Sequence, residues 1–160
     1  MLTILILCTG NSARSIIGEV LFRDLGGKRL TGLSAGSDPK DEPHPQALAT
    51  LAAHGHSVDG LSSKRWDVFA KPGAPEIDAV ITVCDSAAAE TCPVWPGAPV
   101  SAHWGLPDPA AVADPDAARI AFETTYQTLH SRIRLLIDAL DGDDREALAS
   151  ALDALPSLER

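Results

Sequence analysis

The chain has 160 residues, of which 45% are hydrophobic, and this length and composition predict one compact domain with its own core. Its 22 acidic residues outnumber its 13 lysines and arginines, and the resulting formal charge of −9 argues against nucleic acid as a partner, because phosphate backbones are bound by clustered cations. No segment reaches the roughly 20 apolar residues of a membrane span, and residues 1–7 lack the cationic start of a signal peptide, so we expect a cytoplasmic protein that does not bind membranes.

The first half of the chain predicts strands that alternate with helices. An apolar run over residues 4–7 is typical of a short strand, and Gly10-Asn11 ends it in a tight loop. Apolar residues then recur at helical spacing up to Gly26-Gly27. A second strand is expected over residues 30–35. The helix that follows it should run from about His44-Pro45 to Gly55, since proline suits the first turn of a helix.

The middle of the chain continues this alternation. Residues 64–70 predict a short helix and residues 77–84 a buried strand. A short helix through Glu90 and a fourth strand over residues 99–103 follow. Four strands separated by helices predict an α/β fold, a four-stranded parallel sheet with helices on both faces.

The C-terminal part predicts the longest helix. A loop over residues 106–115 contains three prolines, and Asp114-Pro115 starts a helix with one apolar stripe, made of Phe122, Tyr126, Leu129, Ile133, Leu136 and Leu140. Residues 141–143 break this pattern before a small amphipathic helix. We therefore expect a domain over residues 1–140 and a helical appendage over residues 141–160.

Three residues with reactive side chains follow three of the predicted strands. Cys8 follows the first strand, Cys84 ends the third, and Asp108 lies in the loop after the fourth. Ligands of parallel α/β sheets bind outside the carboxyl ends of the strands. The sequence thus predicts one site that contains all three residues.

The segment after the first strand has the form C-x5-R-S and is typical of an anion-binding loop. Its backbone N–H groups and the following helix N-terminus would converge on one point, which favours both a bound oxyanion and a thiolate at Cys8. The guanidinium of Arg14 can hold two oxygens, and Gly10 lets the backbone curl. The hydroxyl of Ser15 could donate to the Cys8 sulfur. The predicted loop consists of Thr9, Gly10, Asn11, Ser12, Ala13, Arg14 and Ser15. The competing interpretation is a buried cysteine beside a solvated arginine.

Four motifs together resemble the arsenate reductases built on the low-molecular-weight protein tyrosine phosphatase fold, over about residues 2–140. They are Cys-Thr-Gly-Asn-Ser-Ala-Arg-Ser at 8–15, Ser-Ala-Gly at 34–36, Val-Cys-Asp with Thr-Cys-Pro at 83–85 and 91–93, and His-Trp-Gly-Leu-Pro-Asp-Pro-Ala at 103–110. The resemblance implies arsenate as substrate, with phosphate or sulfate as competing anions, and it implies no cofactor. It also implies that Asp108 is the general acid.

The resemblance further implies a relay of three thiols. Cys8 would attack arsenate, Cys84 would attack Cys8 to release arsenite, and Cys92 would attack Cys84. The resulting Cys84–Cys92 disulfide would be reduced by thioredoxin, although glutaredoxin or a small thiol remains open as electron donor. Access of a protein partner to this disulfide favours a monomer.

Two other functions remain open. A phosphatase of this fold would use the same loop, but the second loop cysteine of those enzymes is replaced by Ala13, and the aromatic residue expected after Asp-Pro is replaced by Ala110. A phosphatase also has no need of Cys84 and Cys92. The third possibility is a non-catalytic oxyanion-binding or thiol-sensing module, which has no need of Asp108.

We predict no metal site. The chain has no C-x2-C pair and its histidines are scattered, with His54 and His56 expected in solvent. In some of the similar reductases a potassium ion lies beside the anion loop, held in part by residues that match Asn11, Glu19 and Ser34. The aspartate expected near Ser63 is replaced by Lys64 and Arg65, whose charges would repel a cation.

Overall fold

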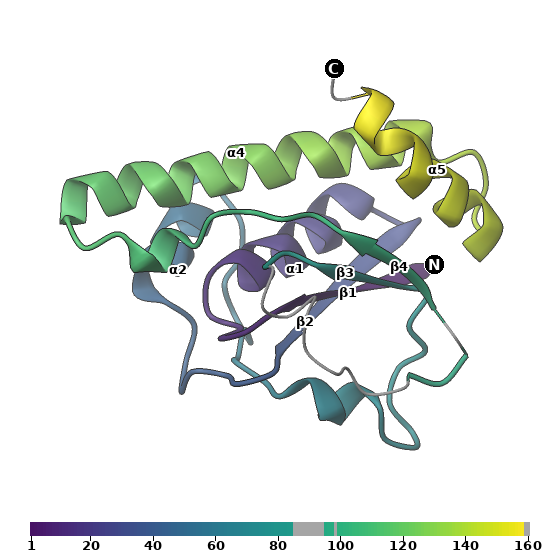
Figure 1. Cartoon of the computed structure of the whole chain (residues 1–160), viewed down its shortest axis with the longest axis horizontal. Helices are drawn as coiled ribbons and strands as arrows, with labels where there is room; N and C mark the ends of the chain where they lie inside the picture. Colours follow the sequence, from purple (N-terminus) through teal and green to yellow (C-terminus); the bar gives the residue numbers. More distant parts are fainter. Residues whose placement is uncertain (85–94, 98, 159–160) are drawn as a thin grey trace.

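A four-stranded parallel sheet with strand order β2-β1-β3-β4 forms the centre of the molecule (Figure 1). The computed structural model describes residues 1–84, 95–97 and 99–158. The strands are β1 (Leu2–Cys8), β2 (Leu30–Gly36), β3 (Ala79–Thr82) and β4 (Val100–His103). All four strands were expected from the sequence, and β3 is shorter than the apolar run that predicts it.

Strand β1 lies between two neighbours and is buried on both faces. Ile4 and Ile6 belong to the main hydrophobic core, whereas Leu5 and Leu7 belong to a second, smaller cluster on the opposite face. A strand of a parallel sheet that is covered on both sides has no polar face, which explains the continuous apolar run.

Helices lie on both faces of the sheet, as predicted, but the two layers differ in size. Helices α1 (Arg14–Gly26), α4 (Pro115–Ala139) and α5 (Arg145–Leu158) form one layer, and α2 (Pro45–Ala53) packs on α1 and α4. On the other face, within the described residues, the short 3-10 helix η1 (Trp66–Phe69) packs near β2 (Figure 1). None of the described helices is long and apolar enough to cross a membrane.

The first residues of helices α4 and α2 follow local signals in the sequence. The Asp114 carboxylate accepts a hydrogen bond from the N–H of Ala117 at 2.8 Å, and Pro115 occupies the first turn of α4. Helix α2 likewise begins with Pro45, behind an N-cap at His44. The predicted apolar stripe of α4 is buried in the main core from Phe122 to Leu140. Capping and stripe together explain where α4 begins and which face it buries.

Helix α5 packs against α4 and β4. Its four buried residues, Leu148, Ala151, Leu152 and Leu155, belong to the same core as the sheet. Arg145 at its first turn donates to the Asp78 carboxylate and to the carbonyl of Ile77, the two residues that precede β3. The separation of residues 141–160 from the domain stays a prediction.

The strand register brings the carboxyl ends of the strands to one edge. Cys8 pairs with Gly36, and Thr82 pairs with both Leu7 and His103. The loops that follow β1, β3 and β4 therefore leave the sheet side by side. This edge is where the sequence places the candidate site.

Candidate active site

The segment between β1 and α1 wraps around the sulfur of Cys8. This side chain is 3% exposed, and its Sγ atom accepts a hydrogen bond from the backbone N–H of Asn11 at 3.2 Å. The Oγ atom of Ser15 lies 2.9 Å from the same sulfur. Cys8 therefore lies at the base of a loop whose N–H groups turn inward, as the C-x5-R-S pattern predicts.

Asn11 fixes the curl of this loop. Its φ angle of 44° lies in the left-handed region, which asparagine tolerates better than most residues. The sequence predicts that Gly10 lets the backbone curl, but the positive φ angle falls on Asn11 and not on Gly10. The Asn11 side chain donates to Ser15 Oγ at 2.8 Å and accepts from the N–H of Lys64 at 2.8 Å. Its own carbonyl accepts from the hydroxyl of Ser63.

Gly36 in β2 allows the loop to approach the sheet closely. A Cβ atom at this position would overlap the carbonyl oxygen of Thr9. It would also lie 3.0 Å from the nitrogen of Asn11 and 3.0 Å from the carbonyl oxygen of Cys8, so all three close contacts are with backbone. The Ser-Ala-Gly motif therefore has a steric reason at its third position.

The environment of Cys8 acts on its pKa in two opposite directions. Burial is the largest influence, and it raises the pKa of the thiol above its ordinary value. The hydrogen bonds from Ser15 and Asn11 and the positive charge of Arg14 lower the pKa. The N-terminus of α1, which starts at Arg14, adds a positive partial charge on the same side. The loop thus supplies the groups that a buried thiolate requires.

Arg14 connects the loop to the segment that contains Asp108. Its Nη1 atom donates to the carbonyl of Leu106 at 2.8 Å, and its Nη2 atom lies 3.8 Å from the Asp108 carboxylate. Its Nε atom is buried and has no hydrogen-bond partner among the described residues. A buried N–H donor without a partner is costly, and a bound oxyanion would satisfy it.

Asp108 lies on the loop between β4 and α4. Its Oδ1 atom accepts from the N–H of Ala110 at 3.0 Å and caps the short 3-10 helix η2 (Pro109–Ala111). The carboxylate is 44% exposed and its other oxygen lies toward Arg14. This position leaves one carboxyl oxygen available to an anion held by the loop. A positioned carboxyl group of this kind can act as general acid.

The loop that contains Asp108 is anchored to the end of β3. The N–H groups of Trp104 and Leu106 donate to the carbonyls of Thr82 and Val83, at 2.7 and 3.0 Å. The Trp104 ring also stacks on Phe22 of α1. These contacts hold the segment that leads to Asp108 against β3 and α1.

Cys84 lies at the same edge of the sheet as Cys8. It is buried, and its Sγ atom lies 3.4 Å from the hydroxyl of Thr9. Thr9 directly follows Cys8 in the chain. The structure therefore brings Cys8, Arg14, Cys84 and Asp108 together, whereas Cys92 and the helix expected through Glu90 lie outside the described residues.

The residues that match a potassium site in some reductases do not fit a metal ion here. The ammonium of Lys64 lies 3.7 Å from the carboxylate of Glu19, which accepts from the hydroxyl of Ser34 at 2.6 Å. Glu19 is thus already paired with a cation from the chain. Within residues 1–84, 95–97 and 99–158, no group of three or more His, Cys, Asp or Glu residues is arranged to bind a metal.

Of the two histidines expected in solvent, His54 is exposed, as predicted, whereas His56 is partly buried. His56 is 12% exposed and lies between the carboxylate of Asp24 and the hydroxyl of Tyr126, both at 2.7 Å. His54 stacks on the Tyr126 ring and contacts Glu123 at 2.8 Å. These contacts join α1, α2 and α4, so we interpret the cluster as structural.

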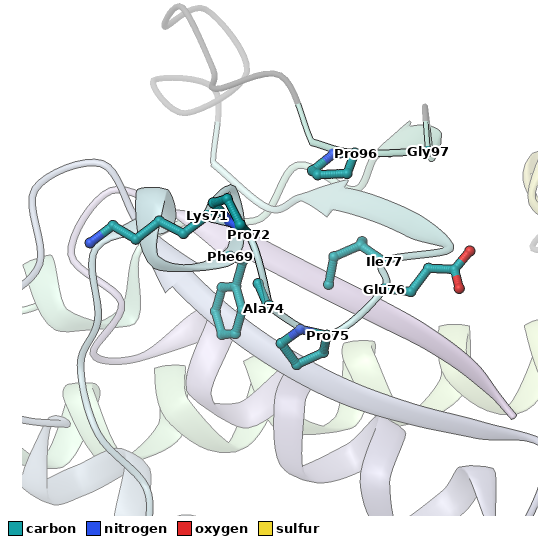
Figure 2. Close-up of a pocket in the computed structure, with 10 residues that line it drawn as sticks. Phe69, Lys71, Pro72, Ala74, Pro75, Glu76, Ile77, Pro96 and Gly97 are labelled. Carbon is teal, nitrogen blue, oxygen red and sulfur yellow. The ribbon is translucent and has the colours of Figure 1, made fainter.

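A separate pocket lies near the start of β3, at the opposite end of this strand from Cys84. Figure 2 shows its walls, with Phe69, Pro72 and Pro75 on one side and Pro96 on the other. Its charged residues are Lys71 and Glu76, of opposite sign. None of the residues assigned to the candidate active site lines it.

Comparison with known proteins identifies the family. Residues 3–146 match the family described as low molecular weight phosphotyrosine protein phosphatase. The chain is 33% identical over 122 residues to arsenate reductase 2 of Staphylococcus saprophyticus, which covers 76% of this chain and 88% of that protein. It is 32% identical over 120 residues to an arsenate reductase of Bacillus licheniformis, covering 75% of this chain and 83% of the relative.

Solved structures agree with this result. An arsenate reductase in its phosphate-binding state superposes with a TM-score of 0.68 at 25% identity, covering 88% of this chain and all of the other. The tyrosine phosphatase Wzb of Escherichia coli K30, in complex with sulphate, has the same TM-score at 24% identity and covers 87% and 98% of the two chains. The second likeness concerns the fold alone.

Proposed function

The chain belongs to the low molecular weight phosphotyrosine protein phosphatase family and is an arsenate reductase within it, and we propose that it reduces arsenate through three cysteines, starting at Cys8. One observation carries this proposal. The thiol of Cys84 contacts Thr9, the residue next to Cys8, so a second sulfur lies beside the anion-binding loop. Hydrolysis of a phosphate ester requires no second thiol, whereas transfer of two electrons to arsenic does.

In the first step the loop would bind arsenate and Cys8 would attack it. The backbone N–H groups and the unpaired Nε of Arg14 would hold the oxyanion. An arsenic–sulfur bond forms as an arsenic–oxygen bond breaks. Asp108 would donate a proton to the leaving oxygen, which departs as water.

In the second step the thiolate of Cys84 would attack the sulfur of Cys8. A sulfur–sulfur bond forms, the sulfur–arsenic bond breaks, and its electron pair remains on arsenic. Arsenic(V) is thereby reduced to arsenic(III) and leaves as arsenite. The two thiols have lost two electrons and are joined as a disulfide.

In the third step Cys92 would attack Cys84 and release Cys8 as a thiolate. The electron pair of the Cys8–Cys84 bond goes to the Cys8 sulfur, and a Cys84–Cys92 disulfide forms. Two thiols can join only when their α-carbons come within about 7 Å. Thioredoxin would then reduce this disulfide, in a cytoplasmic setting that keeps thiols reduced.

A phosphatase activity is the second candidate, because the same loop and acid can form and hydrolyse a cysteinyl-phosphate. The shared fold with a tyrosine phosphatase supports it. Against it stand Ala110, which offers no aromatic surface to a phosphotyrosine ring, and the thiol of Cys84 beside the loop. A passive oxyanion-binding module would make no use of the carboxylate of Asp108 beside Arg14.

A single-turnover experiment tests the proposal. Fully reduced protein is mixed with arsenate without reductant, arsenite is measured, and disulfides are mapped by peptide mass. We expect one arsenite per chain and a Cys84–Cys92 disulfide. The C92S variant should also release one arsenite but accumulate a Cys8–Cys84 disulfide, whereas C84S should release none. Release of arsenite by C84S, or aryl phosphate turnover without any disulfide, would contradict the relay.

The electron donor and the oligomeric state are tested separately. We expect steady-state turnover with thioredoxin, thioredoxin reductase and NADPH, and little turnover when glutathione and glutaredoxin replace them. Equal rates with both systems would contradict a thioredoxin partner. Light scattering should give the mass of a monomer.

A further inference from the structure

Lys64 is a charged residue close to the anion-binding loop that the relay does not use. It follows the segment after α2 and docks against the loop through its backbone. Its N–H donates to the Asn11 side chain, and its carbonyl accepts from the N–H of Gly36 at 2.8 Å. Lys64 therefore contacts both the residue that curls the loop and the glycine on which the loop packs.

The side chain of Lys64 reaches Glu19 of α1. Its ammonium donates to the carbonyl of Ser62 at 2.6 Å and lies 3.7 Å from the carboxylate of Glu19. The two charged side chains are only 24% and 16% exposed. Both charges are thus largely withdrawn from water, where a partner of opposite sign matters most.

Glu19 would be unfavourable for catalysis without this partner. It lies on α1 one turn beyond Ser15, whose hydroxyl contacts the Cys8 sulfur. An unpaired carboxylate there would disfavour a thiolate and repel an incoming oxyanion. The hydroxyl of Ser34 donates to Glu19 at 2.6 Å but brings no positive charge.

We propose that Lys64 is a positioning residue for Cys8: its ammonium, a cation built into the chain, neutralises Glu19 while its backbone N–H fixes Asn11, so that the loop functions without a bound metal ion. A continuous path of contacts connects the two residues. The backbone N–H of Lys64 donates to Asn11, Asn11 donates to Ser15, and Ser15 contacts Cys8. Substitution of the Lys64 side chain leaves this path in place and changes only the charge beside Glu19. The effect on arsenate reduction rests on the proposed function, whereas the effect on Cys8 itself does not.

The first test is independent of arsenate. Cys8 is alkylated with iodoacetamide at pH 7 in the wild type and in K64Q, K64R and K28Q, and modification of Cys8 is followed by peptide mass. We expect alkylation to slow about tenfold in K64Q, because the charge of Glu19 is then left without a cation near the loop, and K64R to restore most of the rate. K28Q is the matched control, because Lys28 is exposed and distant in the chain from the loop.

The second test uses monovalent cations. The wild type should show the same alkylation rate and melting temperature in potassium, sodium and choline chloride at equal ionic strength. In K64D, which leaves two carboxylates without a cation, potassium should raise both quantities above their values in choline. A single-turnover arsenite assay then shows whether arsenate reduction follows the same order.

The outcomes separate the two proposals. A faster alkylation of Cys8 in the wild type with potassium than with choline would overturn the role of Lys64. A K64Q alkylation rate within twofold of the wild-type rate would overturn it as well. If K64Q does not fold, the cation independence of the wild type decides. If alkylation responds as expected but no arsenite forms in any variant, the relay is wrong and the role of Lys64 stands.

Discussion

The Oγ atom of Ser15 lies 2.9 Å from the Sγ atom of Cys8 and at the same time accepts a hydrogen bond from the Asn11 side chain. Because Asn11 occupies the lone-pair side of the hydroxyl, the hydroxyl proton remains available to the sulfur. An ionised sulfur can only accept. The arrangement therefore favours the thiolate form of Cys8 against the cost of burial.

The first prediction concerns S15A. The variant removes a hydrogen bond that lowers the pKa of Cys8, so this pKa should rise. The acid limb of the pH profile of kcat/KM should move to higher pH by the same amount. The measurement is the rate of Cys8 alkylation between pH 5 and 10. The exposed S101A serves as control, and an unchanged profile in S15A would show that Ser15 does not stabilise the thiolate.

The second prediction concerns D108N. An amide cannot donate the proton that the leaving oxygen needs, so arsenite formation in a single turnover should slow by about 10²- to 10⁴-fold. Phosphate binding, measured by calorimetry, should not weaken, because Arg14 and the loop N–H groups hold the anion. Equal losses of binding and rate would instead indicate that Asp108 acts by orienting Arg14.

The third prediction concerns G36A. A Cβ at this position would overlap the carbonyl oxygen of Thr9 and crowd Asn11 and Cys8, so the loop must shift outward. Displacement of a reacting group by about 1 Å costs on the order of 100-fold in rate. We expect G36A to retain its helical circular dichroism and lose single-turnover arsenite formation to that extent. Wild-type activity would mean that the loop tolerates the displacement.

Local patterns in the sequence predict most of the fold. The apolar run of β1 and the Asp114-Pro115 start of α4 are signals contained within a few residues. The common edge of Cys8, Cys84 and Asp108 follows from a general property of parallel sheets. The strand and the helix start are determined by residues next to one another in the chain. The common edge then follows once the strands are parallel.

The remaining features depend on contacts between distant parts of the chain. The steric role of Gly36 arises from its pairing with Cys8, 28 positions earlier. The pairing of Lys64 with Glu19 joins a loop to a helix, and no spacing rule indicates it. His56 was expected in solvent because its local sequence does not show that Asp24 and Tyr126 lie on either side of it.

The fourth prediction concerns pH and Asp24. Its hydrogen bond to Arg23, with that from His56 and both charges, lowers the pKa of this carboxyl in the folded state. A lowered folded pKa contributes stability that is present above the unfolded value near 4 and is lost as the pH falls through the folded value. D24N should therefore be less stable than the wild type at pH 7, and this difference should shrink as the pH falls below about 4. Urea unfolding of both proteins at pH 7, 5 and 3 measures this difference in stability, and the substitution D141N, at an exposed position, is the control. A difference that stays constant with pH would contradict the role of the ionised carboxylate.

The fifth prediction decides whether residues 141–160 are separate from the domain. Leu148 of α5 is fully buried in the main core, so L148A should lower the free energy of unfolding by about 2 to 5 kcal/mol. The exposed D153A on the same helix should change it by less than about 0.5 kcal/mol. If α5 is part of the cooperative unit, L148A will shift one common transition in urea, followed by both circular dichroism and tryptophan fluorescence. If α5 is an appendage, the main transition will stay at its wild-type midpoint, and only a small helical signal will be lost at lower urea concentration.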